Sequence, residues 1–399
     1  MLTSNSTIFN NVQSIPALTS GLHEKERQNL TVSHDYIKKR GYLKYLCSES
    51  VIANYIYYGL GIDKLKVYLS SSWRIQAEEV LRQNLPEAEY MTLSVRKELL
   101  QHMYRCYRLA KLRPSDYFIF NLRNKSDNEI KEYLSDAGMM ELLSKTGARR
   151  LHDVELNEKC NFYKIAAPWF KRRAATIESV EDFDSFAQIT RELGKVIIKP
   201  ASVGCGTGIF IHEYSTEDDL KNTFKDMMSK GHSYIVEQLI VQGPEMASWN
   251  PSSVNTLRIN TFKTRGGVFN HICFIRTGRK GAFVDNGGQG GLFAGIDSNT
   301  GRINTDGHDE HCHTYAKHPD SHITYRGWQI PGWNEVLELA KQIHNDVFPK
   351  HPYIAWDFAQ SSDNGWVLIE GNWGQFVAQQ ILYGKGVKGE VKAFLNNFK

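Results

Sequence analysis

Apolar and polar residues follow two different patterns along the chain, and the change comes near residue 150. Residues 1–30 are polar and predict a loose lead-in, whereas residues 31–150 have a mainly helical pattern. The capping box at 126–129 marks the start of one helix. Residues 116–121 carry a run of aromatic and branched side chains, which predicts a short strand instead.

After residue 150, strand-like apolar runs alternate with helices and glycine-rich loops. Helices are expected at 215–229, which begins with a capping sequence, and at 334–348, where apolar residues share one face. Helices mixed with hairpins predict an α+β architecture rather than a doubly wound parallel sheet. The expected strands are 196–199, 234–237, 256–262, 268–276, 353–359 and 366–372.

The last two of these runs carry the most informative chemistry. Asn364-Gly365 between them is a strong signal for a hairpin turn. Because side chains alternate along a strand, Glu370 and Asn372 share one face, and Asp357 on the neighbouring strand can face the same side. Two carboxylates and an amide oxygen form a site of the kind that magnesium uses together with phosphates and water. The hairpin therefore predicts a metal site in an enzyme that uses a nucleoside triphosphate.

Composition narrows the choice of partners. The chain has 399 residues, of which 41% are hydrophobic and 23% charged, as is ordinary for a globular protein of two or three lobes. Its net charge of +4 is too small to argue for nucleic acid or an anionic membrane. The densest basic run, at 171–173, is expected to lie on a solvated face.

Cysteine usage and hydropathy favour the cytoplasm. The six cysteines are dispersed without CxxC spacing, so neither a zinc site nor a redox pair is expected. The first residues lack a basic segment followed by an apolar one, and we expect no signal peptide. No apolar run approaches the roughly 20 residues that span a bilayer. We therefore expect a cytoplasmic protein without a membrane span.

A lysine and a glycine-rich turn follow the expected strand at 196–199. Lys199 ends that strand, and Gly204, Gly206 and Gly208 come after it. Glycines let backbone N–H groups approach phosphate oxygens, and a lysine adds a point charge. The spacing matches neither a Walker A loop nor GxGxxG. Taken alone, the loop is also compatible with a structural hairpin, which is the more common use of such sequences.

The expected strand at 234–237 ends in a second candidate segment. The residues from Glu237 to Ile240 can present backbone groups to an adenine edge. Glu245, after Gly243-Pro244, can accept hydrogen bonds from ribose hydroxyls. The alternative is an ordinary strand exit and turn, which we would prefer if the segment stood alone.

In this order, the segments resemble the ATP-grasp superfamily, which includes D-alanine–D-alanine ligase and the ribosomal-protein glutamate ligases. In those ligases an aspartate is followed thirteen residues later by Glu-x-Asn, as Asp357 is followed by Glu370 and Asn372 here. The superfamily also uses an earlier lysine, and Lys159 within 157–163 fills that place. The resemblance implies that Lys159 and Lys199 contact the phosphates of ATP.

The resemblance assigns the remaining contacts by position. Magnesium, or manganese in its place, would be held by Asp357, Glu370 and Asn372. The nucleotide would be bound by Gly206 and Gly208 in the loop, by Glu237 and the backbone of Ile240 at adenine, and by Glu245 at the ribose.

Further segments resemble one family within the superfamily, the sugar-transfer-associated ATP-grasp family. Its name implies a role in cell-surface polysaccharide assembly. The fold that it implies is the α+β ATP-grasp fold, with two lobes clamping ATP at 151–240 and 241–399, after a mostly helical region at 1–150. The segments that carry the resemblance are 251–258, 285–291, 318–320, 330–333 and 356–357, with 117–120 and 132–135 upstream.

Two arginines and an asparagine match the layout of the reacting centre in related ligases. Arg258 and Arg276 lie on successive expected strands, and Asn286 lies in a glycine-rich loop. Fixed cations there would stabilise the charge spread over a transferred phosphoryl group. The alternatives are that one arginine only pairs with a carboxylate of the metal site, and that the 286–291 loop is a mobile lid.

Cysteine and histidine residues near these segments carry weaker signals. Cys205 and Thr207 stand where many superfamily loops have basic or serine-rich tips, which leaves the contact to the γ-phosphate open. Cys205 has no evident base, which argues against a covalent nucleophile. His311 and His313 lack further ligand spacing, so positions at the surface or at the edge of the substrate site are expected.

Three functions are compatible with these residues. The leading hypothesis is an ATP-dependent carboxylate–amine ligase that forms an amide through an acyl phosphate and releases ADP. One alternative is a kinase that uses the same ATP site to phosphorylate a hydroxyl, and another is a non-catalytic nucleotide-binding module. The expected partners are small-molecule carboxylate and amine substrates, with no nucleic acid, and no oligomeric state is predicted.

Overall fold

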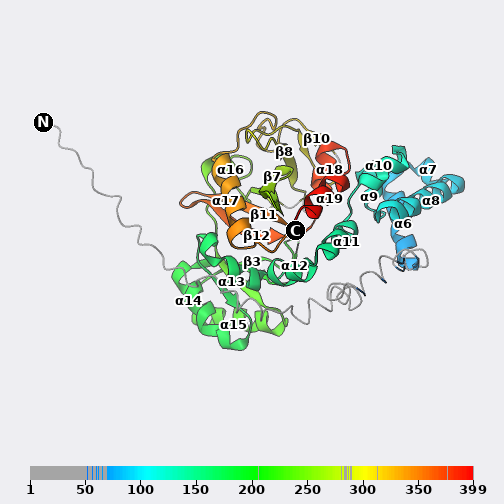
Figure 1. The fold of residues 1–399 in the computed structure, drawn as a ribbon. Helices are drawn as coiled ribbons and strands as arrows, with labels where there is room; N and C mark the ends of the chain where they lie inside the picture. The colour runs from blue at the N-terminus through cyan, green and yellow to red at the C-terminus, as the bar shows by residue number, and fades with distance from the viewer. Residues whose placement is uncertain are drawn as a thin grey trace.

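The computed structural model describes residues 70–398 except 205, 280, 283–284, 286, 288–289, 312 and 375, and also positions 52, 56, 60, 62 and 65. These residues form a helical region, coloured from blue through cyan to green in Figure 1, and then two sheets with helices packed against them. The predicted α+β architecture is confirmed. The lead-in expected at 1–30 lies outside the described residues.

The helical region extends to the first strand and confirms the helical pattern seen in that part of the sequence. The predicted capping box is present: Ser126 Oγ accepts a hydrogen bond from Glu129 N, and the Glu129 carboxylate accepts one from Ser126 N at 2.8 Å. The elements are α6 (Ser71–Asn84), α7 (Glu87–Met91), α8 (Leu93–Ala110), α9 (Asp116–Ile119), η2 (Leu122–Asn124), α10 (Asp127–Glu132), α11 (Asp136–Thr146), α12 (Arg149–Glu155) and α13 (Lys159–Phe170).

The short strand predicted at 116–121 is wrong, because these residues form α9 and lead into η2. Asp116 turns the chain by accepting a hydrogen bond from Arg113 N at 2.7 Å. Tyr117 is 1% exposed, and its hydroxyl lies 2.7 Å from His102 Nδ1 of α8. Packing against α8 therefore buries the aromatic run, and this tertiary contact overrides the local preference for a strand.

Four described strands form a smaller antiparallel sheet in the order β1-β4-β2-β3. Helices α14 and α15 cover one face, where Val196, Ile198 and Val236 join an apolar cluster. Because side chains alternate along a strand, Lys199 and Glu237 point to the opposite face. The elements, which confirm the predicted strands and helix, are β1 (Ala174–Ile177), η3 (Val180–Asp182), α14 (Phe183–Leu193), β2 (Lys195–Pro200), β3 (Phe210–Glu213), α15 (Glu217–Ser229) and β4 (Tyr234–Gln238).

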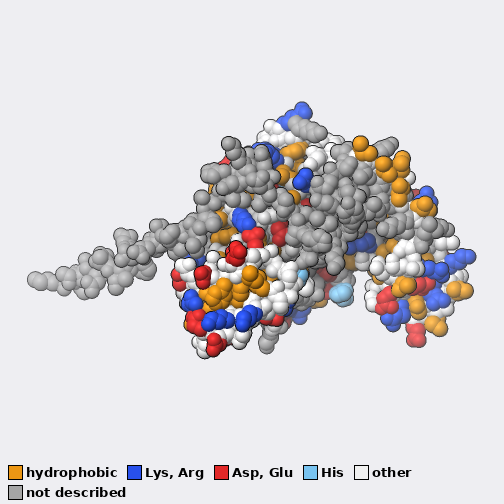
Figure 2. Space-filling model, turned by 90° about the horizontal axis from the view of Figure 1, so that it is seen from below, with side chains coloured by type: hydrophobic (Ala, Val, Ile, Leu, Met, Phe, Trp, Pro, Cys, Tyr) orange, Lys and Arg blue, Asp and Glu red, His pale blue; other side chains and the backbone are white. Residues whose placement is uncertain are grey.

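Hydrophobic and basic side chains gather on the outer surface of this helical layer (Figure 2). A shallow groove there is lined by Phe183 and Phe224, with Lys221 and Lys225 beside them. Helices α14 and α15 cover the face of the small sheet that is opposite to Lys199. The groove therefore lies away from the candidate chemistry.

Eight described strands form the larger sheet, ordered β10-β9-β8-β7-β5-β11-β12, with β6 paired to β5. On one face, Ile259, Ile275 and Trp356 pack in the main apolar core with Val336 of α17. The polar side chains of the central strands are left on the other face. The elements are α16 (Pro244–Ala247), β5 (Thr256–Thr264), β6 (Gly267–Asn270), β7 (Cys273–Thr277), β8 (Leu292–Ile296), β9 (Gly307–His308), β10 (Thr314–Tyr315), α17 (Trp333–Asp346), β11 (Tyr353–Ser361), β12 (Gly365–Asn372), α18 (Val377–Tyr383) and α19 (Lys388–Asn396).

The single strand predicted at 268–276 is divided into two. Strands β6 and β7 both pair with β5, and the chain kinks at His271 and Ile272 between them. Ile272 has a φ of 41°, which is uncommon for a β-branched residue. No glycine or proline marks this kink in the sequence, so periodicity alone could not place it.

Helix α13 connects the two sheets, since it contacts β1 and β4 of the smaller sheet and β12 of the larger one. Residues of α13 such as Phe162 and Ile165 belong to the main apolar core. Within the described part of the chain, we find no helix with the length and apolar character needed to traverse a bilayer.

Candidate functional site

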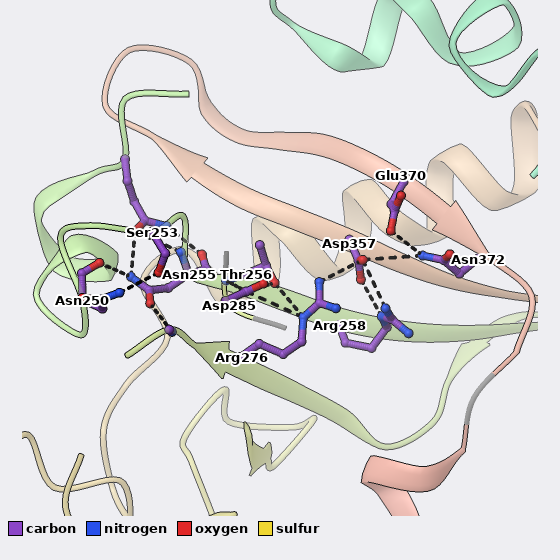
Figure 3. Close-up of polar contacts among 12 residues, drawn as sticks. Asn250, Ser253, Asn255, Thr256, Arg258, Arg276, Asp285, Asp357, Glu370 and Asn372 are labelled. Carbon is purple, nitrogen blue, oxygen red and sulfur yellow. Dashed lines mark hydrogen bonds and ion pairs between the residues drawn. The ribbon is translucent and has the colours of Figure 1, made fainter. Parts of the chain in front are cut away.

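The hairpin of β11 and β12 brings the three predicted metal ligands to one face of the larger sheet (Figure 3). Asp357 lies directly opposite Glu370 in the strand register. Asn372 lies opposite Ala355, which is two residues from Asp357 and therefore on the same face. The three side chains therefore lie together, as the hairpin pattern predicted.

A β-bulge sets this register. Asp357 pairs with Glu370 while the next residue, Phe358, pairs with Leu368, so Ile369 is the extra residue on β12. Without the bulge, Ile369 would stand opposite Asp357. The bulge therefore turns Glu370 toward Asp357, a detail that strand alternation alone does not contain.

Asp357 is the centre of a polar group that extends over four strands. Arg258 on β5 donates from Nε to Oδ1 at 2.5 Å and from Nη2 to Oδ2 at 3.1 Å. Arg276 on β7 places Nη2 2.9 Å from Oδ2. Asn372 Nδ2 lies 3.5 Å from Asp357 Oδ2 and 3.1 Å from Glu370 Oε1. We call these five residues the large-sheet group.

Asp357 keeps its charge although its side chain is only 2% exposed. Burial raises the pKa of Asp357, but attraction to Arg258 and Arg276 outweighs it, and the pKa is lowered. Burial also opposes the charge of Arg276, whose pKa is nevertheless raised by Asp357 and other acidic neighbours. The Arg276 side chain is 16% exposed and that of Arg258 7%, so Arg276 is the more accessible cation.

A second carboxylate holds Arg276 from the other side. Asp285 accepts hydrogen bonds from Thr256 N at 3.0 Å and from Thr256 Oγ1 at 2.5 Å. Thr256 Oγ1 accepts one from Arg276 Nε at 2.9 Å, and Asp285 Oδ2 lies 3.7 Å from the same nitrogen. Sequence reasoning missed Thr256 and Asp285, although each stands within two positions of a predicted site residue, Arg258 or Asn286.

Asn255 fastens the start of β5 to the segment before it (Figure 3). Its side chain is fully buried, and Nδ2 lies 2.8 Å from Gln242 Oε1, 2.9 Å from Met246 O and 3.0 Å from Asn250 O, within hydrogen-bonding distance of all three. Its Oδ1 accepts a hydrogen bond from Gly278 N at 3.0 Å. These bonds fix the ends of β5 and β7, on which the arginines stand.

The smaller sheet buries a second shared carboxylate. Glu237 Oε1 lies 2.9 Å from Lys199 Nζ, and Glu237 Oε2 accepts a hydrogen bond from Arg172 Nε at 2.9 Å. We call these three residues the small-sheet group. The prediction that residues 171–173 lie on a solvated face is wrong for Arg172, because its side chain is only 3% exposed. The left-handed conformation of Lys171 at the end of α13 turns Arg172 inward, which a basic run does not reveal.

Lys159 lies against the glycine-rich loop, and the resemblance implies that both contact the phosphates of ATP. Lys159 Nζ donates to Val203 O at 2.6 Å, and its backbone N donates to Ala201 O at 3.2 Å. Gly206 has a φ of 72° and Gly208 a φ of 74°. A Cβ on Gly208 would come within 3.1 Å of the ring of Pro200, so both conformation and space favour glycine there.

The other predicted residues occupy more open positions. Ile240 follows β4, and Glu245 is exposed on α16, where Gly243 N fixes the turn by donating to Gln360 O at 2.9 Å. His313 is 69% exposed and pairs with Asp309 at 2.8 Å. Asn286 and Cys205 lie outside the described residues, and so no position is given to either.

The profile of the family described as "Sugar-transfer associated ATP-grasp" matches residues 148–396, which is more than half of the chain. The chain belongs to this family. The resemblance in sequence motifs is thereby confirmed, and with it the ATP-grasp fold. No curated protein matches the chain.

Several solved structures are similar to this ATP-grasp chain. D-alanyl-alanine synthetase A from Vibrio cholerae is 11% identical with a TM-score of 0.39, and the match covers 62% of this chain and 66% of the other. D-alanine–D-alanine ligase from Bacillus anthracis is 14% identical with a TM-score of 0.37, covering 62% and 68%. N5-carboxyaminoimidazole synthase from Aspergillus clavatus is 11% identical with a TM-score of 0.38, covering 66% and 58%.

The matched part thus spans about two thirds or less of the length of these proteins.

The large-sheet group fits the divalent ion that the ATP-grasp resemblance implies. Its donors are two carboxylates and an amide, which are oxygen ligands suited to magnesium. Asp357 Oδ1 accepts one hydrogen bond from Arg258 and keeps a second lone pair. A half-turn of the Asn372 amide would present its oxygen. Among the described residues, no three His, Cys, Asp or Glu side chains group as a metal site, so the amide is needed to complete this one.

Proposed function

We propose that this chain is an ATP-dependent carboxylate–amine ligase that forms an amide through an acyl phosphate and releases ADP. The observation that carries the proposal is the convergence of Asp357, Glu370 and Asn372 with two arginines on one sheet face. Membership of the ATP-grasp family supports ATP as the substrate. The association of that family with sugar transfer supports a role in cell-surface polysaccharide assembly.

In the proposed reaction, the two sheets supply different parts of the ATP site. Lys159, Lys199 and the backbone of the loop at Gly206 and Gly208 bind phosphate oxygens. Glu245 binds the ribose, and the backbone that follows Glu237, as far as Ile240, lies along adenine. The Glu237 side chain itself is held by Lys199 and Arg172 and does not reach the base. Magnesium or manganese, bound by the large-sheet carboxylates and Asn372, would neutralise charge on the β- and γ-phosphates.

The chemistry then needs positioning and charge more than covalent work by the protein. An oxygen of the substrate carboxylate attacks the γ-phosphorus, the bond from this phosphorus to the bridging oxygen breaks, and ADP leaves. Arg276, with Arg258 behind it, stabilises the charge on the transferred phosphoryl group. The amine nitrogen attacks the acyl carbon, loses a proton and expels inorganic phosphate.

A product assay tests the proposal. The protein is incubated with Mg·ATP and pairs drawn from amino acids and uronic acids, and the nucleotides, phosphate and organic products are measured by chromatography and mass spectrometry. We expect ADP and phosphate to appear only when a carboxylate and an amine are both present, together with their amide. AMP and pyrophosphate would contradict the proposed ligase, and a phosphorylated hydroxyl compound would identify a kinase instead.

Isotope transfer tests the acyl phosphate. With an active pair, a carboxylate substrate labelled with ¹⁸O should transfer one labelled oxygen to the released phosphate, because that oxygen bridges carbon and phosphorus in the intermediate. Phosphate without label would contradict the acyl-phosphate step while leaving the formation of the amide intact.

A further inference from the structure

Arg172 places a nearly buried side chain between the two sheets. It follows the left-handed residue Lys171, which has a φ of 50°, and its side chain is 3% exposed. Its guanidinium carbon lies 4.6 Å from the centre of the Phe170 ring. A buried guanidinium needs a carboxylate close by, and Glu237 on β4 supplies it.

Glu237 is shared between Arg172 and Lys199. Arg172 Nε lies 2.9 Å from one carboxylate oxygen, and Lys199 Nζ lies 2.9 Å from the other. Two cations and one anion leave the small-sheet group with one net positive charge. Without Arg172, Glu237 would neutralise Lys199, and the group would have no net charge to offer a phosphate.

The carboxylate of Glu237 is charged at neutral pH. Burial raises the pKa of Glu237, but Arg172 and Lys199 more than offset this effect and lower the pKa to about 2. The Lys199 side chain is 12% exposed, whereas those of Arg172 and Glu237 are each 3% exposed. Lys199 is therefore the member of the group that a ligand can reach.

Arg172 also contacts the strand that carries two of the metal candidates. Arg172 Nη1 donates to Leu368 O at 2.5 Å. Leu368 immediately precedes the bulged residue Ile369, which sets Glu370 opposite Asp357. One guanidinium thus binds the side chain of β4 and the main chain of β12.

We propose that Arg172 is a positioning residue that keeps the charge of Lys199 available to ATP phosphates and fixes β4 against β12. Arg172 acts through Glu237 and Leu368 and does not itself touch the nucleotide. The inference rests on the proposed function only in taking Mg·ATP as the ligand, and it makes no assumption about the acceptor.

Calorimetric titration of the full chain with Mg·ATP and, separately, with adenosine tests this role. Arg172→Met removes the charge and keeps an unbranched side chain. We expect Mg·ATP to bind roughly tenfold more weakly, because one unit charge is lost near the phosphates. Adenosine has no phosphate, and its affinity should change by less than about twofold.

A double variant separates charge from structure. Arg172→Met together with Glu237→Gln removes one cation and one anion, so Lys199 is again left with one net positive charge. We expect the double variant to recover Mg·ATP affinity to within about threefold of the original protein, a non-additive result that a purely structural role would not give.

Two further variants serve as controls. Arg172→Lys keeps the charge, and we expect most of the Mg·ATP affinity to remain. Arg173→Met removes the neighbouring arginine, whose partner is Glu192 rather than Glu237, and should leave Mg·ATP affinity unchanged.

The outcomes separate the two proposals. If the unaltered protein does not bind Mg·ATP, the proposed function fails, and the role of Arg172 fails with it. If the unaltered protein binds Mg·ATP and Arg172→Met binds it equally well, only the role of Arg172 is overturned. The same holds if ATP and adenosine weaken alike and the double variant recovers nothing.

Discussion

Each of the two sheets buries one carboxylate between two cations, but the two groups differ in net charge. Glu237 in the smaller sheet is shared by Lys199 and Arg172, which leaves one net positive charge. Asp357 in the larger sheet is likewise shared by two arginines.

In the larger sheet, further acids reverse the balance. Glu370 lies opposite Asp357, so the large-sheet group itself has two carboxylates and two arginines. Asp285, which is outside the group and whose pKa is raised by burial, lies 3.7 Å from Arg276 and brings the carboxylates to three. A positive group suits phosphate oxygens, and a negative group suits a divalent cation. A buried carboxylate shared by two cations can therefore serve either the phosphates or the metal ion of Mg·ATP, depending on whether positive or negative charge is in excess around it.

The largest expected effect comes from removing the charge of Asp357. Asp357→Asn takes away a proposed metal ligand and leaves two arginines without their shared anion. We expect turnover, measured as ADP release, to fall about a thousandfold. Asp363→Asn in the exposed hairpin turn is the matched control and should change nothing. Comparable turnover in both variants would contradict the role given to the large-sheet group.

The comparison also predicts how stability depends on pH. The pKa of Glu237 is 4.5 when unperturbed and about 2 in the fold. The lowered pKa of Glu237 stabilises the fold by on the order of 3 kcal/mol. This stabilisation is fully present above pH 4.5 and is lost as the pH falls toward 2. Glu237→Gln lacks this contribution at every pH.

The difference in urea unfolding midpoint between the original protein and Glu237→Gln should therefore shrink between pH 5 and pH 2. A difference that stays constant through this range would show that Glu237 is not held charged by Arg172 and Lys199.

A smaller effect is expected from Lys199, the accessible member of the small-sheet group. Lys199→Met should raise the KM for ATP by roughly tenfold to a hundredfold, because a phosphate loses its nearest cation. Lys195 lies on the same strand, is 51% exposed and pairs with Glu213 at 3.3 Å. Lys195→Met should leave KM unchanged, and equal effects of the two variants would remove Lys199 from the phosphate site.

The smallest effect is expected from the support behind Arg276. Asp285→Asn weakens the hydrogen bonds by which Asp285 and Thr256 hold Arg276. The ion pair of Arg276 with Asp357 remains. We expect kcat to fall roughly tenfold with little change in Mg·ATP affinity. A rise in KM with unchanged kcat would instead connect Asp285 with substrate binding.

The sequence predicted the parts of the fold and site that depend on local patterns. Strand alternation and the Asn364-Gly365 turn were enough to place Glu370 and Asn372 on one face and to bring Asp357 onto the neighbouring strand, whereas the bulge sets Glu370 opposite Asp357. The family resemblance pointed to Lys159, and the structure places this lysine against the glycine-rich loop, a contact that the sequence did not predict. The ligand roles of these residues stay predictions.

The parts that the sequence did not predict depend on tertiary contacts. The strand at 116–121 failed because Tyr117 packs against α8. The prediction of a solvated position for Arg172 failed because the turn after α13 directs this side chain into the protein. The bulge at Ile369 and the support of Arg276 by Asp285 arise from contacts between neighbouring segments that the pattern of either segment does not reveal.

The most direct test of the charge comparison measures how much magnesium strengthens ATP binding. ATP affinity is titrated with and without Mg²⁺ for the original protein and for Glu370→Gln, which removes one large-sheet carboxylate and leaves the small-sheet group intact. The two carboxylates of the large-sheet group, with Asp285 beside them, predict that Mg²⁺ strengthens binding in the original protein and does so far less in Glu370→Gln, while affinity without Mg²⁺ stays similar. Equal strengthening by Mg²⁺ in both proteins would contradict the metal role of the large-sheet group.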